Sequence, residues 1–207
     1  LGDAQRILVE NYLSAKYNIA LKTGSGATDV YIGDESDNGD FDRGVFGIGR
    51  AGTDDLHTAA ETDGLRFDAA AGLDVGDYLL AGHKKPTNGV SSTDLPSGVA
   101  QRLERAWFID KTDTSPTLTT DVTVDLSKAG LSTLAGDASN YVLLQRTSPG
   151  TGSWSILVDG ASRTVDDRII FQAVDLADES ELTVGTKDDA ASPLSGIALT
   201  ITGTPGN

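Results

Sequence analysis

Alternating apolar and polar residues recur along most of the chain and predict short β-strands. The clearest run, 118–126, places Leu118, Val122 and Leu126 on one face and Asp121 on the other, as expected of a strand with one buried face. The other predicted strands cover 29–32, 45–48, 64–68, 77–81, 106–110, 141–146, 154–158, 168–173 and 181–184. Turn signals separate these runs, and no helices alternate with them, so the pattern predicts a mainly β fold: a β-sandwich of jelly-roll or immunoglobulin-like type.

The opening segment, 1–20, follows a different period and predicts one N-terminal amphipathic α-helix. Val9, Tyr12 and Leu13 fall at i, i+3 and i+4, which places them on one helical face. Asp3 precedes the first apolar residues and is a candidate N-cap. We expect this helix to offer its apolar face to a partner surface.

Three segments follow from these patterns: a helix at 1–20, a β-sandwich domain at 21–186, and a linker with a C-terminal strand at 187–207. The tail strand is predicted because apolar side chains alternate with small and polar ones from Gly196 to Thr202. The chain opens on Leu1 without an initiator Met, a basic n-region or an apolar signal core, so we expect that the true N-terminus has been removed or lies upstream, in a processed or excerpted polypeptide.

Composition excludes several classes of function. The formal net charge is -15, from 31 acidic and 16 basic residues, which disfavours nucleic acid and anionic membrane surfaces as partners. The absence of cysteine excludes disulfides, thiolate metal sites and cysteine catalysis. No apolar run reaches the ~20 residues needed to span a bilayer, so membrane insertion is not expected.

Catalytic motifs are weak, and we expect no enzyme. The run Gly47-x-Gly49-x-x-Gly52 matches a dinucleotide fingerprint in its letters, but it leads into Thr53-Asp54-Asp55 rather than into a helix. Carboxylates at that position would repel a pyrophosphate. The chain also has no G-x-S-x-G nucleophile elbow.

An acidic run at 33–42 is the candidate metal site. Oxygen-bearing side chains occupy its alternate positions, and Gly39 stands where a calcium loop needs its sharp turn. The twelfth position, however, is Val45 rather than the bidentate Glu of an EF-hand. Calcium binding and an ordinary acidic turn both stay open; in the first case the ligands are Asp34, Ser36, Asn38, Asp40 and Asp42.

Two aromatic residues are candidates for stacking on a glycan. Trp107 and Trp154 each lie in or beside a predicted strand, and indole rings stack on sugar faces in many binding sites. The alternative is that both rings belong to the core, which is the commoner place for an aromatic residue in a short strand.

Several phrases resemble a known arrangement in large bacterial surface proteins. The run VENYLSAKYNIAL (9–21) resembles the helix that closes laminin-G-like, concanavalin-type domains. The phrases that follow are similar to a β-sandwich domain of unknown function commonly found after that helix: FGIGR (46–50), RAWFID (105–110), YVLL (141–144) and ELTVG (181–185). The resemblance implies an extracellular module without known catalysis.

The function that we expect is therefore structural. The chain would be an extracellular or cell-surface subunit of a surface layer, matrix or filament, which self-associates by strand addition. The alternatives are that both ends pack on their own domain, or that the protein is an adhesin or carbohydrate-binding module with a calcium-ordered loop and a surface glycan as partner. The residues that we assign to assembly are Leu8, Tyr12, Leu13, Ile197, Leu199 and Ile201.

Overall fold

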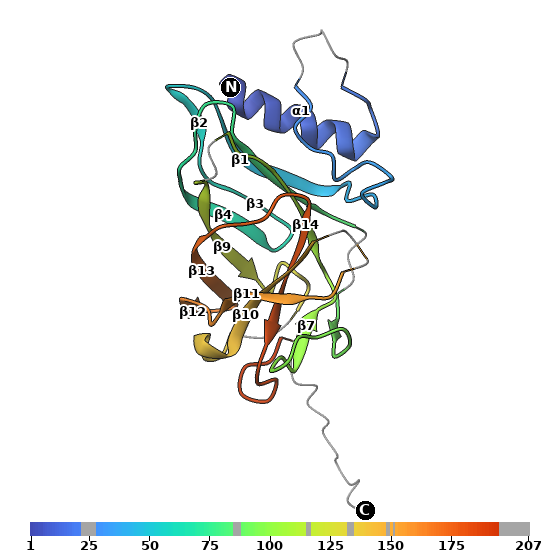
Figure 1. Cartoon of the computed structure of the whole chain (residues 1–207), viewed down its shortest axis with the longest axis vertical. Coiled ribbons are helices and arrows are strands. Elements are labelled where there is room, and N and C mark those ends of the chain that lie inside the picture. Colours follow the sequence, from blue (N-terminus) through green and yellow to red (C-terminus); the bar gives the residue numbers. More distant parts are fainter. Residues whose placement is uncertain are drawn as a thin grey trace, which may run out of the picture.

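Two antiparallel β-sheets form the body of the molecule, and one helix lies across an outer face (Figure 1). This computed structural model describes residues 1–21, 28–84, 88–114, 117–131, 135–147, 150 and 152–194. The predicted mainly β sandwich with an N-terminal helix is confirmed. The predicted tail strand with Ile197, Leu199 and Ile201 lies outside the described residues.

The first sheet runs in the order β11-β10-β14-β8-β5-β1-β2, and β7 pairs with both β14 and β6. Its strands are β1 (Arg43–Gly52), β2 (Asp55–His57), β5 (Tyr78–His83), β6 (Val90–Ser91), β7 (Gln101–Leu103), β8 (Trp107–Thr112), β10 (Tyr141–Thr147), β11 (Ser155–Asp159) and β14 (Ser180–Thr186).

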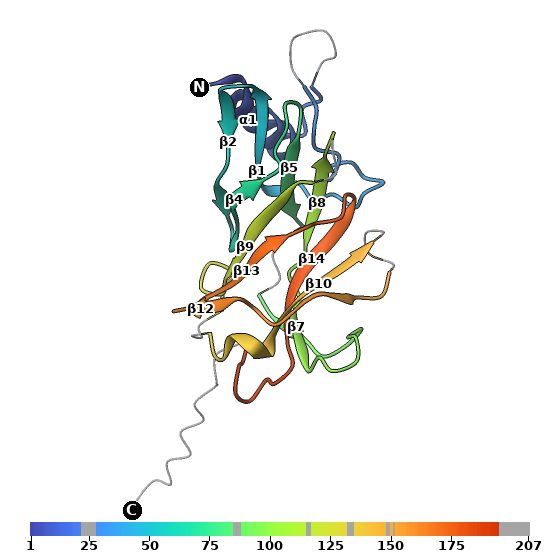
Figure 2. The same cartoon turned by 60° about the vertical axis from the view of Figure 1, so that its left-hand side comes forward.

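The second sheet runs in the order β12-β13-β9-β4-β3. Its strands are β3 (Ala60–Thr62), β4 (Leu65–Ala71), β9 (Thr119–Asp125), β12 (Arg163–Val165) and β13 (Arg168–Val174), and one short 3₁₀ helix, η1 (Ala138–Asn140), precedes β10. Figure 2 shows α1 at the same end of the molecule as β1 and β2.

The main core lies between the two sheets. Val122 and Val124 of β9 lie beside Phe67, Ile169 and Phe171 of the neighbouring strands β4 and β13 on the inner face of the second sheet, and all five are fully buried. The alternation predicted for 118–126 is therefore confirmed, because its apolar residues point into the core while its polar residues line the outer face of the second sheet.

Most predicted strands form, but 29–32 does not. The N–H of Val30 donates to the side chain of Asn11, and the N–H of Ile32 donates to the Asp110 carboxylate. Side chains thus satisfy backbone groups that a neighbouring strand would otherwise take. The segment 28–42 consequently covers the outer face of β8 as a loop. Its own Tyr31 is buried in the apolar cluster that contains Phe108 of β8.

Helix α1 (Asp3–Tyr17) packs against β1 through a face adjacent to the predicted one. Leu8 is buried, whereas Val9 and Leu13 are 44% and 40% exposed. The reason is Asn11, whose amide donates to Ile7 O and Thr28 O while its oxygen accepts from Val30. A fully bonded polar residue therefore takes a core position that its polarity would not predict.

The N-cap prediction is also corrected. Gly2 is the N-cap residue and Asp3 begins the helix. The first N–H groups are instead satisfied from another part of the chain, because the Asp55 carboxylate accepts from Asp3 N at 2.5 Å and from Ala4 N at 3.3 Å. This contact attaches the start of α1 to β2.

Candidate functional site

Strand β1 has a neighbouring strand on each side, but on one of the two sides the pairing covers only part of its length. On one side it pairs with β5, with Phe46 opposite Ala81 and Gly49 opposite Tyr78. On the other side, the pairing with β2 stops where Gly49 lies opposite His57. Within the described ranges, no strand pairs with the stretch before Gly49 on that side, so its main-chain groups form a free, that is unpaired, sheet edge, although residues 45–49 are buried beside α1 and β3.

A groove runs along this free edge, and we call it the β1 groove. Helix α1 forms one wall, and the chain from β2 to β3 forms the other, with His57 and Ala60. The floor at one end is made by Val45, Phe46 and Gly47. This end has a volume of about 290 Å³.

The two ends of the β1 groove differ in chemistry. The first end is lined mainly by apolar atoms, with Leu1, Leu8 and Val9 on the helix side. A second hollow of about 460 Å³ follows at the start of β1, and Tyr12 lines both. It is polar, with Lys16 on the helix wall and Asp63 on the far wall.

A buried histidine closes the polar end. His83 Nε2 lies 3.0 Å from Asp63 Oδ2, and its Nδ1 lies 2.5 Å from Lys84 O. The adjacent Gly44 has a φ of +55°, and a Cβ there would meet the Asp63 carboxylate. The start of β1 therefore favours glycine at position 44, both for its positive φ and for the close approach of the Asp63 carboxylate.

Of the three helix residues predicted to take part in assembly, two line the β1 groove and one does not. Leu8 lies in the groove and contributes to the contact with β1, and Tyr12 lines both parts of the groove. Leu13 does not line it. Local sequence patterns predict a strand at 45–48 but do not identify Val45 to Gly47 as a free edge, because a free edge depends on where the neighbouring strand ends.

The acidic loop forms a compact turn. Phe41 N donates to Gly33 O at 2.7 Å, and the Asn38 side chain donates to Ile32 O at 2.8 Å. Ser36 and Asp40 are exposed. Within the part of the chain that is described, no group of three or more His, Asp or Glu side chains is arranged to hold a metal ion. Calcium binding through Asp34, Ser36, Asn38, Asp40 and Asp42 stays a prediction.

Two carboxyl groups, one in this loop and one on the neighbouring strand β8, have pKa values well above the usual range for aspartate. Burial, together with repulsion from Asp178 and other carboxylates, raises the pKa of Asp110 to about 7 despite a hydrogen bond from Ile32 N. Burial and repulsion from Asp29 and its neighbours also raise the pKa of Asp34 to about 6. Asp110 is thus half-protonated near pH 7 and Asp34 near pH 6.

Neither tryptophan presents an exposed ring face. Trp107 is fully buried in the main core. Trp154 is also buried, on the outer face of the first sheet, and the guanidinium groups of Arg102 and Arg146 lie 5.2 and 4.5 Å from its ring centroid. Glycan stacking on these rings therefore has no support from their placement, and a glycan partner stays a prediction.

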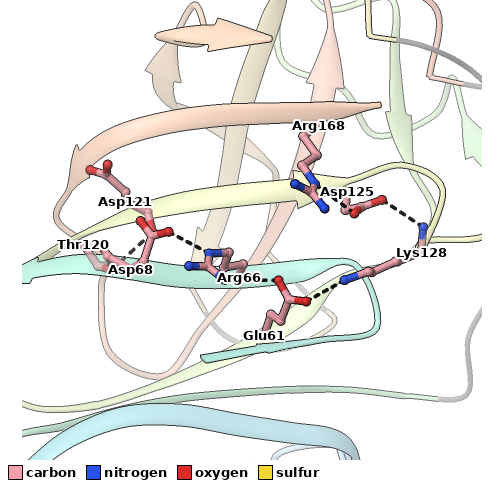
Figure 3. A network of polar contacts seen from close by, with 8 residues as sticks. All are labelled: Glu61, Arg66, Asp68, Thr120, Asp121, Asp125, Lys128 and Arg168. Atoms are coloured by element: carbon pink, nitrogen blue, oxygen red, sulfur yellow. Dashed lines mark hydrogen bonds and ion pairs between the residues drawn. The ribbon is translucent and has the colours of Figure 1, made fainter. Parts of the chain in front are cut away.

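The outer face of the second sheet carries a polar hollow of about 470 Å³. Figure 3 shows acidic and basic side chains from β3, β4, β9 and β13, together with Lys128, gathered on this face, with Asp68 and Asp121 on neighbouring strands. Hydrogen bonds from Lys128 and Arg66 lower the pKa of Glu61. The ion pairs are Arg66–Glu61, Arg66–Asp68, Lys128–Glu61 and Arg168–Asp125, with N–O distances of 3.3, 2.6, 2.6 and 3.2 Å. These groups neutralise one another, so we do not select this hollow as the functional site.

Comparison of the chain with protein-family models, with curated proteins and with solved structures gave no match. The resemblance to the surface-protein domain therefore stays a prediction. Among the described residues, no helix is long and apolar enough to cross a membrane. The β1 groove is the candidate that the geometry supports best, because it combines a free main-chain edge with an apolar wall.

Proposed function

We propose that this chain is an extracellular structural subunit of a surface layer, matrix or filament, which assembles through its terminal segments. One observation carries the proposal: the free edge of β1, before Gly49, runs beside an apolar groove. Sheet edges of this kind pair readily with a strand from another chain unless they are covered or charged.

The surface chemistry agrees with a structural role. The ion pairs on the second sheet neutralise its outer face, while the net charge of -15 opposes non-specific association between copies. Self-association would therefore be confined to places where apolar surface and free main-chain groups occur together. The β1 groove is such a place.

Removal of residues 196–207 is expected to abolish assembly. The apolar row Ile197, Leu199 and Ile201 would be lost, and with it the segment that can add to a neighbour's sheet. Electron microscopy and light scattering of the full and shortened chains measure this. As a matched control, a chain of full length with serine at these three positions should behave like the shortened one. Polymers of undiminished length from either variant would overturn the proposal.

A further inference from the structure

We propose that the β1 groove is the acceptor for the segment Gly196–Thr202 of a second copy of this chain, which adds to the free edge of β1 as a new strand. This inference rests on the proposed structural function and specifies its contact. The free edge supplies the main-chain donors and acceptors, and the walls of the groove supply the selectivity for side chains.

The tail segment fits the length of the free edge. Gly196–Thr202 contains seven residues, which span ~23 Å when extended at about 3.3 Å per residue. The part of β1 before Gly49, 43–48, spans ~20 Å by the same measure. One copy of the tail is therefore long enough to cover the edge and exceeds it by one residue.

The tail segment also fits the groove in chemistry. Residues 195–207 carry no charged side chain, and the groove is apolar beside Leu8 and Val9. In a strand, Ile197, Leu199 and Ile201 share one face, and this apolar row suits the helix wall. The opposite row consists of alanine and threonine, which are small enough for the wall formed by His57 and Ala60.

The position of the tail favours a second copy over the chain's own groove. The last described residues pack beside η1, where Asn140 donates to Ser192 and Tyr141 donates to Pro193 O. Strand β14 ends beside β7, with Thr186 opposite Gln101. Figure 1 places β7 and the red end of the described chain at the opposite end of the molecule from α1.

Donor and acceptor on opposite ends of one molecule produce a head-to-tail contact. Such a contact is heterologous, because two different surfaces meet, and repetition gives a ring or an open filament. Each added tail also covers an edge that would otherwise stay unpaired. The first copy in a filament keeps an empty groove, and the last keeps an unbound tail.

Engineered cysteines test this contact in the full chain, because the natural sequence contains no cysteine. A chain carrying Val9→Cys is mixed with a chain carrying Leu199→Cys under mild oxidation, and the covalent heterodimer is measured on a non-reducing gel. Val165→Cys replaces Val9→Cys in the control, because Val165 is 46% exposed and Val9 is 44% exposed. We expect the Val9 pair to crosslink at least about tenfold faster, since binding raises the effective concentration of the two thiols.

The outcomes separate this inference from the proposed function. Fast crosslinking at Val9 alone supports the groove as acceptor. Copies that associate in light scattering, yet crosslink equally at Val9 and Val165, overturn the groove and leave the structural role in place. Copies that stay monomeric at all concentrations, with slow crosslinking at both positions, overturn both.

Discussion

Replacing Asp110 with asparagine is expected to stabilise the folded chain at pH 8 by on the order of 2–4 kcal/mol. Asp110 is buried, and burial raises its pKa from 3.8 to about 7. Ionisation of this group above that pKa therefore costs free energy in the folded state only. Asparagine cannot ionise, and its amide oxygen can still accept from Ile32 N, which lies 2.7 Å from the carboxylate.

The sign of the pH dependence follows from the raised pKa. The proton on Asp110 favours the folded state fully below the unfolded pKa of 3.8, and this contribution is lost as the pH rises through about 7. The gain from Asp110→Asn should therefore vanish near pH 4. Urea unfolding of both chains at pH 4, 6 and 8 measures it, with Asp54→Asn as the control at an exposed position. A gain that is equal at all three pH values would contradict the assignment.

Removal of Glu181 alone is expected to cost about 3 kcal/mol of unfolding free energy. The Glu181 side chain is 2% exposed, and it pairs with Arg146, which is 15% exposed. Arg146 Nε lies 2.8 Å from the carboxylate, and the same guanidinium covers Trp154. Glu181→Leu leaves this cation desolvated beside the indole without its principal partner.

The double variant Arg146→Met with Glu181→Leu should recover most of that loss, because no unpaired charge is left behind. Asp159→Ala breaks an exposed pair with Lys187 and serves as the control, with an expected cost below about 1 kcal/mol. Denaturant unfolding of the four chains gives these differences. A double variant as unstable as Glu181→Leu alone would show that lost packing, rather than the unpaired cation, determines the cost.

The sequence predicts the long, regularly alternating strands of this fold well. The segment of strand β9 is the best case, because the apolar residues from Leu118, just before the strand, to Leu126, just after it, all belong to one core. Strands such as β2 and β3 have three residues each, which is too short for a period to be recognised. Segment 28–42 was predicted in part as a strand because no local rule shows that Asn11 and Asp110 satisfy its backbone.

The candidate site could be predicted only in part for the same physical reason. The amphipathic helix and the alternating tail are local patterns, and both were recognised from the sequence. The acceptor depends instead on β2 ending at His57 while β1 begins at Arg43, and on Asp55 attaching α1 beside that edge. These are contacts between distant segments, and local periodicity does not contain them.

Amide hydrogen exchange of β1 tests the central claim most directly, namely that a neighbour's strand completes this sheet. Exchange is compared between the assembled full chain and the chain without residues 196–207, with β11 as the reference because it forms the opposite edge of the same sheet. We predict that amides in 43–48 exchange at least about tenfold more slowly in the assembled chain while those of β11 are unchanged. Equal exchange of β1 in both chains, or protection of β11 instead, would contradict the claim.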